Sequence, residues 1–270
     1  MKERLDTLLV ARGLTESREK ARALIMEGAV LVNGIKAQKA GEQVQDTAEI
    51  TVKENALPFV SRGGLKLQKA LEVFPIDLTG RICADVGAST GGFTDCMLQH
   101  GASHVYSLDV GYGQLHWKLR NDPRVTVLER KNARFMEPDW FDAAPSFGSI
   151  DVSFISLKLI LPPLFQCLTE GGEVVALIKP QFEAGRNEIG KNGVVRDRKI
   201  HGRVIAETIR MAKEIGFCVC SLDYSPITGP KGNIEFLLYL KKQPEDMGIS
   251  HDEMEEIIEN VVSAAHDNCI

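Results

Sequence analysis

A glycine-rich turn between a predicted strand and a predicted helix is the clearest chemical feature of the sequence. It reads DVGASTGGFTD and begins at Asp85, and its glycines let the backbone turn tightly and approach a ligand closely. The pattern is not Gly-x-Gly-x-x-Gly, and Asp85 would be a poor neighbour for the pyrophosphate of a dinucleotide. An acidic strand end suits a ligand with a cationic amino-acid group, such as S-adenosylmethionine. Asp109, at the end of the next strand, is placed to accept hydrogen bonds from a ribose diol. The alternative is a helix start that binds no ligand.

Four charged residues, scattered along the sequence, form a second group. Asp151 and Lys179 lie near the ends of predicted strands, Glu235 lies in the last predicted strand, and Lys66 lies on the helix that precedes the first. Because ligands of open α/β sheets bind at the carboxyl ends of the strands, we expect Asp151 and Lys179 to face one site. Two neighbouring lysines lower each other's pKa, and burial lowers it further, so one of them could take a proton from a sugar hydroxyl. Considered alone, each of these residues could instead be a structural charge at a strand end that is paired with a neighbouring group and takes no part in catalysis.

Alternating strands and helices from about residue 80 must position these side chains. The pattern predicts an α/β fold with a doubly wound, mostly parallel sheet of seven strands. The loop between the last two strands is too short for a parallel crossover, so we expect an antiparallel pair there. We predict strands at 81–86, 105–110, 125–128, 148–152, 173–179, 217–223 and 234–240, and helices at 91–100, 156–169, 199–215 and 250–266.

The first 55 residues predict a separate small module. Leucines at helical spacing and two glycines, Gly13 and Gly28, indicate two short helices, the second with Ser17 as its N-cap. Asn33-Gly34 between short apolar runs indicates a β-hairpin. Arg18 and Arg22 are four residues apart and therefore project from one helix face. The module is too small for an active-site cleft, so we interpret it as a binding domain.

Length and charge agree with two unequal domains. The chain has 270 residues, of which 44% are hydrophobic and 26% charged, and its net charge is −5. Residues 1–39 hold eight Lys and Arg against five Asp and Glu, whereas residues 241–270 hold two against eight. A nucleic-acid partner therefore remains compatible with the acidic total. We predict a binding domain at 1–55, a linker at 56–61, a catalytic domain at 62–244 and an acidic helix at 245–270.

Several classes of protein are disfavoured. Six dispersed cysteines are too few for a disulfide scaffold, and the six histidines are dispersed along the chain, which disfavours a metal site. The longest apolar runs have about five residues, far fewer than a membrane-spanning helix needs, and the N-terminus lacks the apolar core of a signal peptide. We therefore expect a cytoplasmic protein without a metal and without a membrane partner.

Several strings resemble the TlyA (hemolysin-A) family over about residues 2–241. They are DVGASTGGFTDC from Asp85, DVGYGQL from Asp109, DVSFISL from Asp151, IKPQFEAGR from Ile178 and GPKGNIEF from Gly229, and SREKA from Ser17 with VNG from Val32 resembles the family's S-four-type RNA-binding domain. The resemblance implies a Rossmann-like, FtsJ-like methyltransferase domain that moves a methyl group from S-adenosylmethionine to a 2′-hydroxyl of ribosomal RNA, with cytidine as the expected nucleoside. Ribosomal RNA or ribosomal subunits are the implied partner. An RNA-binding or ribosome-assembly factor and a hemolysin-like membrane-active protein are the alternatives.

The resemblance also implies roles for particular residues. The family's catalytic set would be Lys66, Asp151, Lys179 and Glu235. The cofactor would contact Asp85, Gly87, Ser89, Thr90, Gly92, Phe93, Asp109 and Val110. RNA would contact Arg4, Arg18, Arg22, Lys39 and Arg62. Two segments depart from the family's pattern: Leu57-Pro-Phe-Val60 stands where some members have Arg-x-Trp-Val, and the acidic tail after Gln243 matches none of the family's strings given above.

Overall fold

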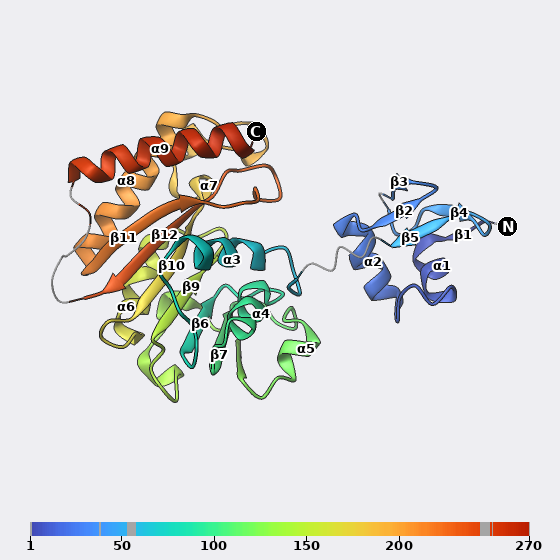
Figure 1. Ribbon diagram of the computed structural model, residues 1–270, viewed down its shortest axis with the longest axis horizontal. Coiled ribbons are helices and arrows are strands. Elements are labelled where there is room, and N and C mark those ends of the chain that lie inside the picture. The colour runs from blue at the N-terminus through green and yellow to red at the C-terminus, as the bar shows by residue number, and fades with distance from the viewer. Residues whose placement is uncertain (1, 38, 53–57, 244–248, 250, 270) are drawn as a thin grey trace. The chain divides into compact units, whose positions relative to one another are not determined.

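The chain forms two compact units, residues 1–58 and residues 59–270. The computed structural model describes residues 2–37, 39–52, 58–243, 249 and 251–269 (Figure 1). Several residues of the predicted domains lie outside this range: residues 1, 38 and 53–55 of the binding domain, 56 and 57 of the linker, 244 of the catalytic domain, and 245–248, 250 and 270 of the tail. Phe59 is buried among the residues of the second unit, so that unit begins there.

The first unit contains the predicted helices and hairpin. Ser17 accepts a hydrogen bond from the backbone N–H of Lys20 at the start of the second helix, and Gly28 ends that helix with a φ of 75°. Asn33 and Gly34 both have positive φ, as a two-residue hairpin turn requires. These local predictions are confirmed. The elements are β1 (Lys2–Arg4), α1 (Leu5–Ala11), α2 (Arg18–Glu27), β2 (Val30–Val32), β3 (Ile35–Lys36), β4 (Gln43–Gln45) and β5 (Ile50–Val52).

The second unit is built on a seven-stranded sheet in the order β11-β12-β10-β9-β6-β7-β8. Five strands form a parallel set, whereas β12 runs antiparallel to both of its neighbours. The predicted doubly wound fold with an antiparallel last strand is confirmed, and that strand lies between β10 and β11. The strands are β6 (Ile82–Val86), β7 (His104–Asp109), β8 (Val125–Glu129), β9 (Phe147–Ile150), β10 (Glu173–Ile178), β11 (Phe217–Tyr224) and β12 (Phe236–Lys242).

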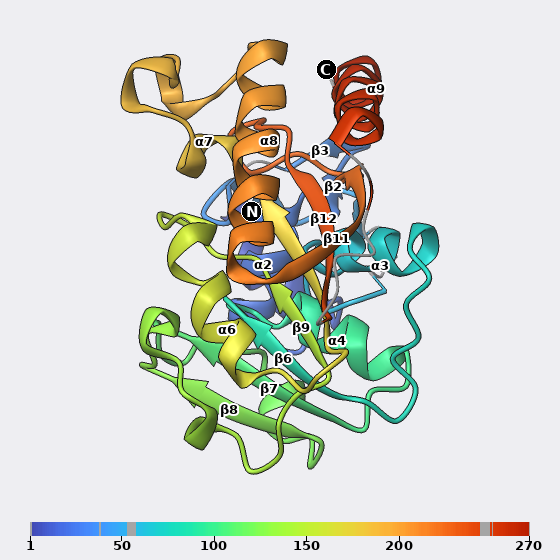
Figure 2. The same ribbon diagram turned by 90° about the vertical axis from the view of Figure 1, so that its left-hand side faces the viewer.

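Helices cover both faces of this sheet (Figures 1 and 2). Strand β10 shows why, because Val174, Ala176 and Ile178 face one apolar core while Val175 and Leu177 face the other. Helices α6 and α8 pack on the first face, and α3 and α4 pack on the second. The helices are α3 (Gly64–Val73), α4 (Gly92–Gln99), α5 (Trp117–Arg120), α6 (Leu161–Cys167), α7 (Pro180–Glu183) and α8 (Arg198–Ile215).

The helix predicted at 156–169 is interrupted. A 3₁₀ turn at Leu157–Leu159 precedes α6, which starts at Leu161. Pro162 and Pro163 lack the N–H groups that a continuous helix would need to bond the preceding turn, so the helix begins anew at this point.

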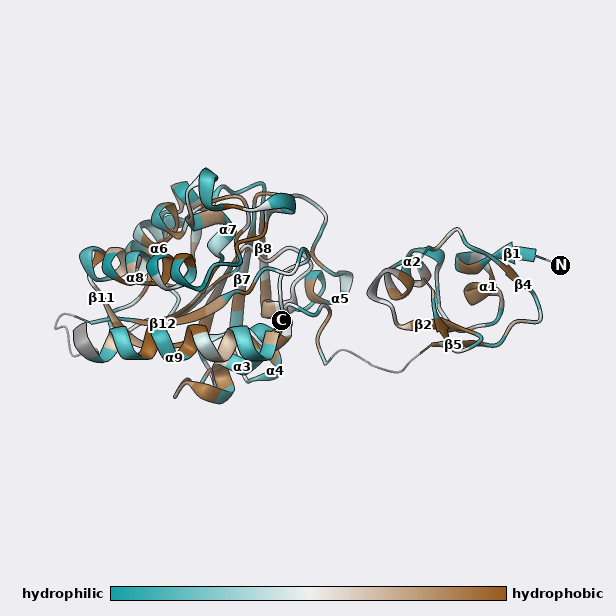
Figure 3. Ribbon diagram, turned by 90° about the horizontal axis from the view of Figure 1, so that it is seen from above, coloured by the Kyte–Doolittle hydropathy of each residue, from teal (hydrophilic) through white to brown (hydrophobic). Residues whose placement is uncertain are grey.

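The last helix, α9 (His251–Cys269), packs against α8 and β11. Met254, Ile258, Val262 and Ala265 are buried on one side of it, and Figure 3 shows apolar and polar segments alternating along its length. The helical spacing predicted for this segment is therefore confirmed. Among the described helices, none combines the length and the apolar character needed to cross a membrane.

Candidate active site

Four charged side chains meet at one edge of the sheet. Asp151 directly follows β9, Lys179 directly follows β10, and Lys66 reaches the same edge from α3. Glu235 directly precedes β12, whose first residue pairs with Ile178 at the carboxyl end of β10. The reversed direction of β12 thus brings an N-terminal strand residue to the edge at which parallel strands bind ligands.

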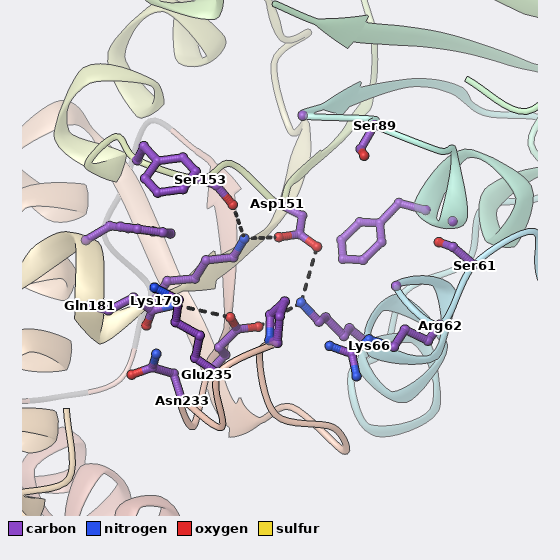
Figure 4. Close-up of a pocket in the computed structure, with 18 of the residues that line it drawn as sticks. Ser61, Arg62, Lys66, Ser89, Asp151, Ser153, Lys179, Gln181, Asn233 and Glu235 are labelled. Atoms are coloured by element: carbon purple, nitrogen blue, oxygen red, sulfur yellow. Dashed lines mark hydrogen bonds and ion pairs between the residues drawn. The ribbon is translucent and has the colours of Figure 1, made fainter. Parts of the chain in front are cut away.

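Asp151 lies between the two lysines (Figure 4). Its Oδ1 is 2.5 Å from Lys179 Nζ, and its Oδ2 is 3.3 Å from Lys66 Nζ. Lys66 Nζ also lies 2.7 Å from Glu235 Oε2, and Lys179 Nζ donates a hydrogen bond of 3.2 Å to Ser153 Oγ. The two lysines and two carboxylates therefore form one continuous ionic cluster.

Burial makes this cluster electrostatically strong. Lys66 and Lys179 are only 8% and 7% exposed. Burial lowers the pKa of Lys66, but Asp151 and Glu235 outweigh that effect, and the pKa is raised above its ordinary value. Burial similarly raises the pKa of Asp151, and the two lysines outweigh it, so that pKa is lowered. The expectation of a lowered lysine pKa is wrong for Lys66, because a carboxylate separates the ammonium groups.

The glycine-rich turn joins the end of β6 to the start of α4. Gly87, Ser89 and Gly91 have positive φ values of 91°, 49° and 95°. A Cβ atom on Gly87 would lie 2.7 Å from the carbonyl oxygen of Asp151, so only glycine fits beside the ionic cluster. Asp109 stabilises the turn, because its carboxylate accepts a hydrogen bond of 2.8 Å from the N–H of Ser89. The same carboxylate accepts a hydrogen bond of 2.7 Å from the N–H of Gly111.

Asp85 occupies a different environment from the one we expected. Its carboxylate is fully buried and accepts hydrogen bonds from Ser149 Oγ and from both the N–H and the hydroxyl of Thr94. Burial raises its pKa to about 6, although these hydrogen bonds act in the opposite direction. The side chain is therefore placed to fix β6 to α4 and β9, and a direct contact with a bound cofactor is at odds with its burial.

Two cavities open along this edge of the sheet and share a wall. The first has a volume of about 670 Å³ and is lined by the four charged residues together with Arg62, Thr90, Gly92 and Phe93. The second has a volume of about 450 Å³ and is lined by Asp109 and Val110, among others. Gly87, Ser89, Asp151, Ser153 and Phe154 border both cavities. A ligand in one cavity would thus touch a ligand in the other beside the ionic cluster.

The remaining sequence candidates lie in the first unit. Arg4, Arg18 and Arg22 converge on the buried carboxylate of Asp6, at distances of 3.0, 2.9 and 3.2 Å. Arg4 in particular, with Arg18 and Arg22, holds the pKa of Asp6 well below its usual range. The three arginine side chains stay about half exposed, and Lys39 is exposed.

Sequence reasoning missed three residues that the structure makes prominent. Asp6 organises the arginines, and Ser153 contacts Lys179. Phe154 is 91% exposed with a φ of 63°, at the boundary between the two cavities. An aromatic side chain held in this backbone conformation is suited to contact a planar ligand. Ser153 and Phe154 could have been found from the DVSFISL string, in which they follow Asp151 by two and three residues.

Comparison with known proteins identifies a family for each unit of the chain. Residues 59–242 match the FtsJ-like methyltransferase family, and residues 3–50 match the S4 domain family. The chain is 52% identical to Bacillus subtilis YqxC, covering 98% of this chain and 94% of that protein. It is 44% identical to the 16S/23S rRNA (cytidine-2′-O)-methyltransferase TlyA of Mycobacterium tuberculosis, covering 96% and 97%. A solved Streptococcus thermophilus structure is 50% identical, with a TM-score of 0.79 and coverage of 99% and 96%.

Proposed function

The chain belongs to the FtsJ-like methyltransferase family, and from that premise we propose that it methylates a ribose 2′-hydroxyl of cytidine in ribosomal RNA. The observation that carries this proposal is the buried cluster of Lys66, Asp151, Lys179 and Glu235 beside the glycine-rich turn. The Mycobacterium tuberculosis relative is a 16S/23S rRNA (cytidine-2′-O)-methyltransferase, which supports ribosomal RNA and cytidine as the substrate. These comparisons favour the methyltransferase over an RNA-binding factor without activity or a membrane-active protein.

The methyl donor is S-adenosylmethionine, and the second cavity suits it. Asp109 stands at the end of β7, where it can accept hydrogen bonds from the donor's ribose, and Val110 would contact the adenine. Ser89 and Gly87 lie where the two cavities meet, which is where the reacting end of the donor has to be. When bound, the donor supplies an already activated sulfonium methyl group. The protein therefore has mainly to align the two reactants.

We assign Lys179 to the reacting hydroxyl. Asp151 and Ser153 hold two sides of its ammonium group, which fixes the direction of the remaining N–H toward the cavity. As an ammonium group, Lys179 would stabilise the alkoxide that forms on the ribose oxygen. To act as the base it would have to be neutral, with a lone pair in place of this N–H to take the hydroxyl proton. Lys66, held by Asp151 and Glu235, would bind the nucleotide, and Arg62 would contact its phosphate.

The first unit supplies a second contact with RNA. We propose that Arg4, Arg18, Arg22 and Lys39 bind phosphates of the ribosomal RNA or ribosomal subunit. Because ribosomal RNA is the proposed substrate, we place the enzyme in the cytoplasm. The residues that the structure describes form no cluster of His, Cys, Asp and Glu suited to a metal ion.

Mapping of 2′-O-methyl groups in ribosomal RNA tests the proposal. We expect purified protein and S-adenosylmethionine to produce a 2′-O-methylcytidine that is absent when the donor is left out. Asp109→Ala should weaken donor binding by about 1.5–3 kcal/mol, the range for a hydrogen bond to a charged group, so a high donor concentration should restore methylation. A methyl group on a base, or an unmodified RNA at every donor concentration, would contradict the proposal.

A further inference from the structure

Two buried histidines join the C-terminal helix α9 to the interior of the second unit. His266 of α9 is 8% exposed, and His201 of α8 is fully buried. His266 Nε2 lies 3.0 Å from His201 Nδ1, and His201 Nε2 lies 3.2 Å from the carbonyl oxygen of Val195. Because a carbonyl oxygen only accepts, His201 carries its proton on Nε2, and its Nδ1 accepts a hydrogen bond from His266. When both rings are neutral and in these tautomers, His201 Nδ1, His201 Nε2 and His266 Nε2 each have a hydrogen-bond partner.

The surroundings keep both rings neutral. Burial lowers the pKa of His201 to about 4, and the neighbouring His266 acts in the same direction. Burial also lowers the pKa of His266, as does Arg198, whereas Asp267 and Asp197 act in the opposite direction. The donor and acceptor roles of the pair are therefore fixed at neutral pH.

The hydrogen-bonded chain continues from Val195 to the first cavity. The N–H of Val195 donates to Asn233 Oδ1 at 3.0 Å, and Asn233 Nδ2 donates to the carbonyl oxygen of Gly193 at 3.0 Å. Gly193 and Asn233 line the first cavity together with Ile189. We call residues 189–195 the acceptor-side wall. Two hydrogen bonds in series thus connect α9 to Val195 of this wall, and two more connect Val195 through Asn233 to Gly193.

We infer that His201 and His266 are positioning residues through which α9 holds the acceptor-side wall in place for the RNA substrate. The inference rests on the proposed function, because it assigns the first cavity to RNA. Burying two imidazoles is unfavourable unless they are hydrogen-bonded, and an apolar pair would serve simple packing better. A satisfied polar pair instead selects one arrangement of the helix and the wall. None of residues 189–195 lines the second cavity, so donor binding should not depend on the pair.

Substitutions of His266 separate this role from general packing of α9. His266→Leu removes the donor and leaves His201 Nδ1 without a partner, whereas His266→Gln keeps an amide N–H in about the same place. Asp267→Asn is the matched control at the neighbouring position. It removes an exposed ion pair of 3.1 Å with Arg198, and because Asp267 acts to raise the pKa of His266, its loss leaves that ring neutral. The measurements are the KM for RNA, the Kd for S-adenosylmethionine, and amide hydrogen exchange over residues 189–197.

We expect His266→Leu to raise the KM for RNA about fivefold or more, the ratio that corresponds to about 1 kcal/mol for one hydrogen bond. Exchange over residues 189–197 should accelerate, and the Kd for the donor should stay unchanged. His266→Gln and Asp267→Asn should resemble the unaltered protein.

Unchanged KM and exchange in His266→Leu would overturn the inference. Equal losses in all three variants would overturn it too, because they would indicate that α9 acts only by packing. If the unaltered protein methylates no RNA, the proposed function fails, and the exchange comparison still decides whether the pair holds the wall.

Discussion

Asp151 is the residue on which the arrangement of the site depends. It contacts both lysines, and its backbone oxygen faces Gly87 of the glycine-rich turn. A single carboxylate therefore sets the spacing between the group assigned to the hydroxyl and the turn assigned to the donor. Loss of one partner of such a buried ion pair leaves an uncompensated charge, which is strongly unfavourable.

Lys179 should be essential for the chemical step and dispensable for donor binding. Lys179→Ala should abolish methyl transfer while the Kd for S-adenosylmethionine changes by no more than a few-fold, because the lysine faces the acceptor hydroxyl. Lys179→Arg should fail as well, since a guanidinium keeps its proton and is larger than the ammonium group that Asp151 and Ser153 hold. Single-turnover methylation and calorimetry measure the two quantities. Near-normal turnover in either variant would remove Lys179 from the mechanism.

Asp85 should make the stability of the second unit depend on pH in an unusual direction. Its pKa is raised to about 6 from an ordinary value of 3.8, so between these values the folded state binds a proton that the unfolded state has released. The stabilisation from Asp85 is therefore complete below about pH 4 and is lost as the pH rises through about 6. Asp85→Asn does not titrate. Its free energy of unfolding relative to the unaltered protein should therefore increase between pH 4.5 and pH 7, by up to about 3 kcal/mol.

Denaturant unfolding at several pH values measures this difference. Asp122→Asn is the control, because the hydrogen bond from Arg124 lowers the pKa of Asp122. That carboxylate stabilises the fold above its ordinary pKa and loses this effect as the pH falls. Between pH 4.5 and pH 7 the stability of Asp122→Asn relative to the unaltered protein should therefore stay constant, because Asp122 is ionised there in both the folded and the unfolded state. A parallel rise of both variants would contradict the assignment of a raised pKa to Asp85.

At the scale of elements, the strands were predictable because both faces of the sheet are buried, so that each strand is a nearly continuous apolar run. The spatial position of β12 was not, since nothing local in Phe236–Lys242 records that it inserts between β10 and β11. The break before α6 follows from Pro162 and Pro163. The spacing of the apolar residues alone predicts one continuous helix and takes no account of these prolines. The same limit applies to the site: Lys66, Asp151, Lys179 and Glu235 were found by strand ends and family resemblance. The contacts of Asp6 and Ser153 depend on how separate segments pack.

The turn after β6 should tolerate no side chain at Gly87. Gly87→Ala combines a positive φ of 91° with a Cβ 2.7 Å from the Asp151 oxygen, so the turn or the end of β9 has to move. We expect lower thermal stability, weaker donor binding and slower methyl transfer together. Gly80→Ala is the matched control, because its φ is also positive, at 72°, but no atom lies within 4 Å of the added Cβ. Equal behaviour of the two variants would show that backbone conformation alone matters at Gly87.

At the scale of the whole molecule, basic and acidic residues are concentrated in different parts of the chain. Three arginines of the first unit gather around Asp6, whereas the acidic residues near the C-terminus lie largely on α9. The first unit has its own apolar core, which includes Leu5, Leu9 and Ile25. A change on the surface of that unit should therefore alter RNA binding without altering the donor site.

Replacing Arg18 and Arg22 tests this division. If both contact phosphates, Arg18→Ala with Arg22→Ala should weaken RNA binding and flatten the log–log dependence of affinity on salt by roughly one unit per lost contact. The same change leaves the buried Asp6 with Arg4 as its remaining arginine partner, so it should also destabilise the first unit. Arg18→Lys with Arg22→Lys separates the two effects, because lysine keeps the charge that releases counterions but lacks the planar fork of donors.

The salt dependence of binding to ribosomal subunits distinguishes the outcomes. We expect the alanine pair to show the flatter slope and the lysine pair to keep nearly the full slope, with the Kd for S-adenosylmethionine the same in both. Circular dichroism and urea unfolding show whether the first unit remains folded under the binding conditions. If the variant with alanine at both positions is folded and its salt dependence is unchanged, Arg18 and Arg22 act by neutralising the buried Asp6 and stabilising the first unit. The phosphate contacts would then belong to the second unit, around Arg62–Lys66 and Lys191–Arg198.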